Sequence, residues 1–149
     1  MGTAAKEQSI VIEITLLNIV PPTTTHQSKK IVKCGKFSKM ADSDALNKAK
    51  DFWTQLLIPF KTLSPIECPV SLVIEIAWPY RASEPKKNQN ARMKHTSKPD
   101  CSNMAKTIED RLVELGFIKD DAQVCELIVR KFWDKTGYTN IRIIERQAA

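Results

Sequence analysis

The chain has 149 residues, of which 42% are hydrophobic and 27% charged, a composition typical of a globular domain large enough to bury a core. The formal net charge is +6, no apolar run has the roughly 18 residues of a membrane span, and the start MGTAAKEQS has no signal-peptide core. We therefore expect one cytosolic domain over residues 1–149, flexible at residues 1–9, whose widely spaced cysteines are reduced thiols rather than zinc ligands or disulfides.

The first third of the chain predicts a strand, a basic segment and a helix. Residues 10–20 place apolar side chains at alternate positions, which predicts a strand. Residues 23–40 are polar and lysine-rich without a helical or strand period, so we expect a long loop or a loose hairpin. A helix is expected to run to about Leu57 from an N-cap at Asp42 or Ser43.

The middle of the chain combines a clear strand with a second basic segment. Residues 70–78 alternate strictly and predict a half-buried strand. Residues 29–39 and 81–98 are both strongly basic and are expected to contact a phosphate backbone, although solvated loops often have the same composition. The candidate DNA-binding residues are Lys29, Lys30, Lys33, Lys36, Lys86, Lys87, Arg92, Lys94 and Lys98.

A second helix is predicted from an N-cap at Ser102 to about Leu115, with Gly116 ending it. Its apolar residues share one face, which predicts that this face packs on the core. The roughly opposite face looks outward and carries Asn103, Lys106 and Asp110.

The last part of the chain predicts two strands. Residues 122–133 and 138–145 are β-rich and flank a turn, so we expect them to pair as a hairpin. The element order is then β-α-β-α-β-β. This order predicts an α+β fold with two layers, a mixed β-sheet with both helices on one face.

Acidic residues bracket the second predicted helix and suggest a magnesium site facing a phosphate. Asp100 precedes the helix, and Asp120 and Asp121 follow it. In phosphodiester cleavage, Mg²⁺ held by a few carboxylates acts as a Lewis acid and compensates charge at the leaving oxygen. A helix of about 14 residues spans roughly 21 Å. The acids therefore meet only if the chain doubles back along the helix or if they act across a subunit interface.

Lys106 lies one turn inside the helix, where its ammonium group can reach a phosphate oxygen and stabilise developing negative charge. Asp110 follows four residues later and is placed to pair with it. Ordinary alternatives stay open, because Asp-Asp pairs are more often turns than ligands and an exposed lysine is usually solvated. A structural domain whose acids only cap and turn the chain uses the same residue types.

In these motifs the chain resembles the RusA family of Holliday-junction resolvases, small magnesium-dependent endonucleases of bacteria and their phages. The resemblance implies a homodimer that makes paired symmetric nicks in a four-way DNA junction, in recombination and repair, with Mg²⁺ or Mn²⁺ as cofactor. It implies that Asp100 and Asp121 are metal ligands, joined by Asp120 as a further candidate, and that Lys106 is catalytic. The matching residues are Lys98-Pro99-Asp100, Asn103, Lys106, Asp110, Asp120-Asp121-Ala122-Gln123-Val124 and Pro21-Pro22-Thr23, with Asn103, Asp110 and Gln123 expected to support the site.

One candidate catalytic position departs from the family pattern. Ser102 stands where the K-P-D-x-D-N motif of the family has its second acid, and a hydroxyl is a weaker magnesium ligand than a carboxylate. Three alternatives follow. Asp120 or Glu109 compensates for the missing acid, or the protein is a weakened or inactive relative that binds branched DNA without cutting it, or the serine is an engineered substitution that traps substrate.

Overall fold

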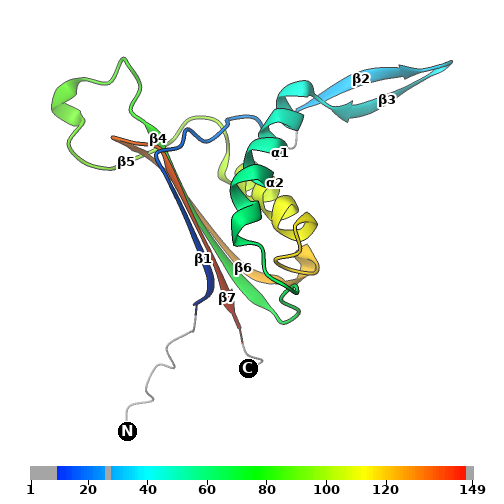
Figure 1. Cartoon of the computed structure of the whole chain (residues 1–149). Helices are drawn as coiled ribbons and strands as arrows, with labels where there is room; N and C mark the ends of the chain where they lie inside the picture. Colours follow the sequence, from blue (N-terminus) through cyan, green and yellow to red (C-terminus); the bar gives the residue numbers. More distant parts are fainter. Residues whose placement is uncertain (1–9, 26–27, 147–149) are drawn as a thin grey trace, which may run out of the picture.

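The computed structural model describes residues 10–25 and 28–146 (Figure 1), so the predicted flexibility of residues 1–9 lies outside the described part of the chain. In this part, a five-stranded mixed sheet, a two-stranded sheet and two α-helices are present, which confirms the α+β prediction. No helix of the described residues combines the length and the apolarity needed to cross a bilayer. The elements are β1 (Ile10–Leu17), β2 (Lys29–Cys34), β3 (Phe37–Asp42), α1 (Asp44–Leu57), η1 (Ile58–Phe60), β4 (Val70–Pro79), η2 (Lys86–Asn88), β5 (Met93–Lys94), α2 (Cys101–Glu114), η3 (Asp121–Gln123), β6 (Val124–Asp134) and β7 (Tyr138–Glu145).

The main sheet has the strand order β1-β7-β4-β6-β5, with β4 at its centre. β4 pairs in parallel with β6 and antiparallel with β7, so the predicted hairpin between β6 and β7 is wrong. The physical reason is burial, because nearly every residue of β4 is buried and such a strand belongs between two neighbours. The turn after β6 instead passes around the end of β4, where the Tyr80 amide donates to the Asp134 carbonyl at 3.0 Å.

The core lies between the sheet and the two helices, which cover the same face. Alternate residues of β4, beginning with Leu72 and Ile74, point into this layer, as the strand period predicts. The helices contribute Trp53 from α1 and Ile108 from α2, both fully buried. The two-layer arrangement with both helices on one face is therefore confirmed (Figure 1).

The helix caps follow the sequence prediction at three of the four ends considered. Ser43 is the N-cap of α1, and its side chain accepts a hydrogen bond from the Leu46 amide at 3.0 Å. α1 ends at Leu57 as expected, and Gly116 follows the end of α2 with a φ of 78°. The prediction that Ser102 caps α2 is wrong, because Asp100 is the extended N-cap residue and its carbonyl already accepts the first helical hydrogen bond.

β2 and β3 form an antiparallel hairpin, residues 29–42, which we call the arm. It extends away from the main sheet and the helices (Figure 1), with Gly35 at its tip in a left-handed conformation, φ 59°. Of the two alternatives for this segment, the hairpin is therefore the one adopted. The sequence shows no strand period here because both faces of the arm are exposed, and neither face had to be apolar.

Candidate active site

The segment that leads into α2 is fastened to β6 by Lys131. The Lys131 ammonium group donates to the carbonyl oxygens of Ser97, at 2.7 Å, and Pro99, at 2.6 Å. His95 is buried and stacks on the Trp133 ring at 4.0 Å. Burial lowers the pKa of His95, so the imidazole is neutral near pH 7 and its Nδ1 accepts a hydrogen bond from the Ser97 amide at 3.2 Å. These contacts fix the backbone immediately before Asp100.

Asp100 presents an exposed carboxylate at the N-terminus of α2. Its side chain is 50% exposed and makes no capping hydrogen bond, so it is not used to hold the helix. Both carboxylate oxygens instead accept from the Lys98 ammonium group at 2.9 Å. A carboxylate paired with one flexible lysine is available for another cation once the lysine moves.

Gln123 holds the turn that carries Asp121. Its Oε1 accepts from the amides of Lys119 and Asp120 at 2.7 and 2.8 Å, and its Nε2 donates to the carbonyls of Ile66 and Cys68 at 2.7 and 3.0 Å. The amide group therefore uses both of its ends to tie this turn to the segment before β4. Gln123 was predicted to support the site, and that role stays a prediction; what the structure shows is its attachment of the turn.

Asp120 has a structural contact of its own. Its Oδ1 accepts from the Ala122 amide at 2.8 Å, and together with Gln123 it forms a capping box at the start of η3. Asp121 is the first residue of η3, and its side chain is 45% exposed. The two adjacent acids thus differ, since one side chain caps the turn while the other reaches towards α2.

Lys106 joins the helix to the acidic turn. Its ammonium group lies 3.0 Å from Asp121 Oδ2 and 2.9 Å from Asp110 Oδ1. The hydrogen bonds that Lys106 donates to Asp110 and Asp121 raise its pKa well above the usual range, so it remains a cation. The same contact with Lys106 lowers the pKa of Asp121, which favours the ionised carboxylate.

The contact between Lys106 and Asp121 means that the chain does double back along α2. Asp100 is six residues from Lys106, which corresponds to about 9 Å along the helix axis. The sequence alone left open whether the acids on either side of the helix approach one another within one subunit. In the structure, the Asp121 carboxylate contacts Lys106, and Asp121 lines one pocket together with Asp110 and Glu114 of the second half of α2.

The acids at the two ends of α2 offer carboxylate oxygens, which are ligands that Mg²⁺ prefers, from separate positions in the fold. No group of three or more acidic, histidine or cysteine side chains is arranged to hold a metal in residues 10–25 and 28–146. Mg²⁺ often uses only one or two carboxylates and takes water and phosphate oxygens as its other ligands. Asp100 and Asp121 each expose a carboxylate that contacts a lysine, so each has the chemistry of a magnesium ligand when taken by itself.

The remaining candidate residues of the site lie along α2. Ser102 is exposed in the first turn of the helix, and Asn103 is half-buried beside it. Burial raises the pKa of Glu109, the other acid considered as a replacement for the missing family residue. Asp110 is placed four residues from Lys106, as predicted, and forms an ion pair with it.

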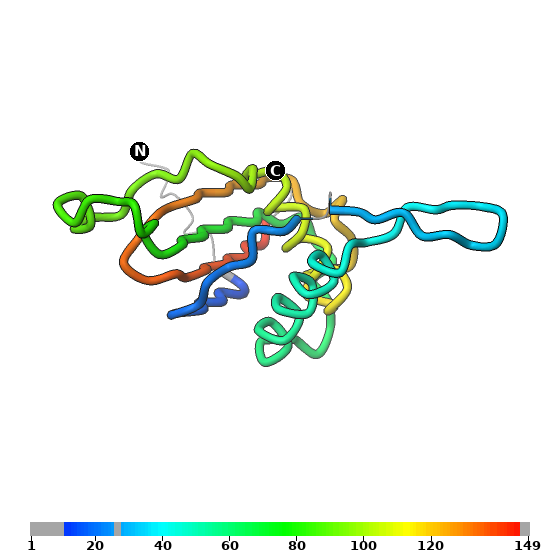
Figure 2. The backbone as a smooth tube through the Cα atoms, turned by 90° about the horizontal axis from the view of Figure 1, so that it is seen from above, coloured from blue at the N-terminus to red at the C-terminus, as the bar shows by residue number. Residues whose placement is uncertain are grey.

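The candidate DNA-binding residues lie in two separate regions. The arm and the segment that contains η2 project from opposite ends of the molecule, as both views show (Figures 1 and 2). Several of these side chains already have partners in the fold, since Lys29 pairs with Asp42 and Lys30 with Asp44, while Arg92 stacks on the Phe132 ring at 3.7 Å. The other candidates are exposed, namely Lys33, Lys36, Lys86, Lys87, Lys94 and Lys98.

Two residues that hold the site were not found from the sequence. Lys131 shares the inward face of β6 with Val129 and Trp133. A charged residue on an otherwise apolar face was therefore the one sign in the sequence that Lys131 has a structural role. His95 carried no such signal, because it follows a segment without periodicity and its stacking partners come from β4 and β6.

A comparison with models of known protein families identifies the family of this chain. The family model described as endodeoxyribonuclease RusA matches residues 19–144, which include both basic segments and the whole candidate site. A search of curated proteins found no match. The matched family consists of endonucleases that resolve Holliday junctions, generally with a divalent metal, and therefore acts on branched DNA. Because the match covers most of the chain, this protein belongs to the RusA endodeoxyribonuclease family.

Proposed function

We propose that this protein is a magnesium-dependent endonuclease that resolves four-way DNA junctions by paired symmetric nicks. The observation that carries the proposal is the contact of Lys106 with Asp121, beside the helix that begins at Asp100. It joins two of the three residues that the resemblance implies for metal binding and catalysis, and the third, Asp100, precedes the same helix. Such an enzyme would act in the cytoplasm of a bacterium, in DNA recombination and repair.

In this proposal, Asp100 and Asp121 hold the divalent ion, and Asp120 stays with the turn that it caps. When bound, the ion supplies Lewis-acid activation of the phosphate and neutralises charge at the leaving oxygen. Lys106 donates a hydrogen bond to a non-bridging phosphate oxygen, where negative charge develops during attack by water. Asp110 continues to orient Lys106 when Asp121 turns away from it, since the ammonium group contacts both acids.

The free edge of β6 supports a homodimer, which two symmetric cuts require. β5 covers β6 only opposite Phe132 and Trp133, so the outer edge of residues 124–130 has no strand partner among the described residues. Leu127 on this strand is 44% exposed. An uncovered edge of this kind is a favourable place for a strand from a second copy. Sedimentation should then give a dimer of about twice the 16.9 kDa chain mass.

A junction-cleavage assay tests the proposal directly. A synthetic four-way junction incubated with the protein and Mg²⁺ should be cut at symmetric positions in two opposing strands, and EDTA should stop the reaction. Asp121→Asn should reduce the rate by at least about 100-fold, because it removes a charged ligand. Asp51→Asn is the matched control, since Asp51 is exposed on α1. An intact junction after prolonged incubation with Mg²⁺ and with Mn²⁺ would refute cleavage.

A second candidate function is junction binding without cutting, and Ser102 is the observation that favours it. This serine is exposed in the first turn of α2, where the family pattern has an acid. Ser102→Asp restores that acid at a site open to solvent, so the fold should tolerate it. A large gain in cleavage rate would identify an attenuated enzyme. An unchanged rate would instead mean that the other residues form a sufficient site.

A further inference from the structure

The outer part of the arm carries apolar side chains that the fold does not use. Phe37 next to the tip is 80% exposed, and Ile31 and Met40 are 72% and 65% exposed. Ile31 and Met40 are directly opposite each other in the β2–β3 register, so they form one apolar pair on one face. Each strand has six residues, which corresponds to a projection of about 20 Å at the usual rise. These side chains therefore lie well away from the core.

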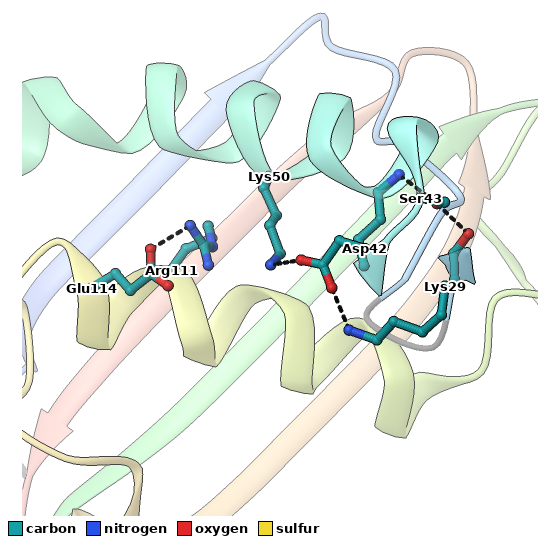
Figure 3. A network of polar contacts seen from close by, with 8 residues as sticks. Lys29, Asp42, Ser43, Lys50, Arg111 and Glu114 are labelled. Atoms are coloured by element: carbon teal, nitrogen blue, oxygen red, sulfur yellow. Dashed lines mark hydrogen bonds and ion pairs between the residues drawn. The ribbon is translucent and has the colours of Figure 1, made fainter. Parts of the chain in front are cut away.

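The base of the arm is fastened firmly to α1. The Asp42 carboxylate accepts from both Lys29 and Lys50, and it lies between these two ammonium groups (Figure 3). The hydroxyl groups of Ser28 and Ser43 are 2.6 Å apart, and Ser43 is also the N-cap of α1. A two-stranded hairpin is only marginally stable alone, so this attachment holds it in place relative to the helices.

The charges of the arm divide into a paired base and an unpaired outer part. Lys29 and Lys30 pair with Asp42 and Asp44 at the base. The three lysines further out are exposed and form no ion pair with any described residue, and residues 31–41 contain no acid. These outer lysines are Lys33, Lys36 and Lys39.

We propose that the arm enters a groove at the branch point of the DNA junction and that Phe37 stacks there on a base. This inference rests on the proposed function and specifies how the substrate is recognised. A two-stranded ribbon is narrow enough for the major groove, and Phe, Ile and Met are the side chains that proteins insert between base steps. The outer lysines then lie along the phosphates on both sides of the ribbon. When a junction is held open, bases at the branch point lack a stacking neighbour on one side, so an inserted ring costs less there than within a continuous duplex.

The same surface is a poor docking site for another copy of the arm. The outer part is purely cationic, so two identical arms would repel each other. A phosphate backbone has the complementary charge along the whole length of the ribbon. The alternation of lysines with exposed apolar side chains thus matches a nucleic acid, whose surface combines phosphates with flat base faces.

Phe37→Ala tests the stacking contact. The probe is a four-way junction with 2-aminopurine at the branch point, and a linear duplex of the same sequence serves as the reference. With the wild type, 2-aminopurine fluorescence should change on binding to the junction. In the variant this change should disappear and junction binding should weaken by about ten-fold, a typical loss for one base–aromatic stack. Phe60→Ala is the matched control because Phe60 is also partly exposed, at 39%, but lies in η1.

The lysines are tested by their effect on salt dependence. Changing Lys33, Lys36 and Lys39 together to Gln should reduce the slope of log K against log salt by about 2.7, or 0.9 for each lost phosphate contact. The same changes at three exposed lysines elsewhere should leave the slope near that of the wild type. The control lysines are Lys48, Lys61 and Lys135.

Two outcomes separate this inference from the proposed function. If wild-type protein cuts the junction while Phe37→Ala binds and cuts it equally well, the arm is not the recognition element and the inference is overturned. If no cleavage occurs but the 2-aminopurine signal still depends on Phe37, the inference stands and the proposed cleavage fails. A change of oligomeric state in Phe37→Ala, with unchanged DNA binding, would assign the arm to contacts between protein copies and overturn the inference.

Discussion

Replacing Gln123 by Leu should loosen the turn that carries Asp121 without removing any charged group. The side chain makes four hydrogen bonds, two as acceptor to the amides of Lys119 and Asp120 and two as donor to the carbonyls of Ile66 and Cys68. Leu is apolar and of comparable volume, although it branches one carbon earlier, and it forms none of these bonds. The substitution therefore removes all four hydrogen bonds at once while it keeps most of the side-chain volume.

The expected loss of folding free energy in the Leu variant comes mainly from the two carbonyl groups that lose their hydrogen-bond donor. Gln123 is half-buried, and each carbonyl that loses its donor costs about 1 kcal/mol, whereas the two amides lie in an exposed turn where water replaces the lost acceptor. The loss is then about 2 kcal/mol, which for a chain of this size lowers the melting temperature by about 6 °C. Gln123→Glu should cost at least as much at pH 7, because it places a carboxylate oxygen against the same two carbonyls while it keeps the acceptor for the amides.

Thermal melting and amide hydrogen exchange measure these effects together. In the Leu variant, the amides of Lys119 and Asp120 should exchange faster than in the wild type, and in the Glu variant they should stay protected. Cleavage should fall in both variants, since both release the turn from the segment before β4. Gln55→Leu on the exposed side of α1 is the control. A Leu variant that melts within about 1 °C of the wild type, with unchanged amide exchange, would show that the turn is held by other contacts.

Three further changes test other parts of the structure. Lys131→Met should lower the free energy of unfolding by about 2 kcal/mol, because it removes two charge-assisted hydrogen bonds. It should also raise the Mg²⁺ concentration needed for half-maximal cleavage. A variant with the metal requirement of the wild type would contradict the role of Lys131 in placing Asp100. Asp42 has its pKa lowered from 3.8 to about 2 by hydrogen bonds from Lys29 and Lys50, so its stabilising contribution is present above about pH 4 and disappears as the pH falls towards 2. Asp42→Asn should accordingly melt below the wild type at pH 7, with a difference that closes near pH 2, and a difference that does not vary with pH would refute this. Gly137→Ala should cost about 3 kcal/mol by chemical denaturation, because an added Cβ would lie 1.8 Å from the Ile19 carbonyl oxygen, whereas Thr136→Ala at the neighbouring exposed position should be nearly neutral.

Local patterns were sufficient to predict most of the elements. β7 was predicted at its observed bounds, and α1 and β4 within one residue, because each has a clear apolar period, and α1 and β4 also have a cap or a proline at their ends. The order of the strands in the sheet could not be predicted from such local patterns. Whether β6 pairs with β7 or with β4 depends on which strand is most buried, and that is decided by the whole sheet rather than by the turn at residues 134–137.

The candidate site was predicted as a set of residues but not as an arrangement. The acids and Lys106 were found by their spacing, and the structure adds that Asp121 approaches Lys106 while Asp120 caps η3. The supporting contacts come from distant positions, because Lys131 follows the Ser97 carbonyl that it binds by 34 residues. No local pattern connects such residues, and their partnership arises only when β6 packs beside the start of α2.

The position of β7 between β1 and β4 has a consequence during protein synthesis. Asn140 on β7 and Glu13 on β1 are 127 positions apart in the chain and are joined by a hydrogen bond. β1 has β7 as its neighbour in the sheet, and both long neighbours of β4 are made after it. The growing chain therefore exposes unpaired apolar strands until residue 145 has left the ribosome, and the layer that supports α2 closes last. The start of α2 is fastened to β6 and the acidic turn to the segment before β4, so both depend on a sheet that is complete only when its last strand is in place.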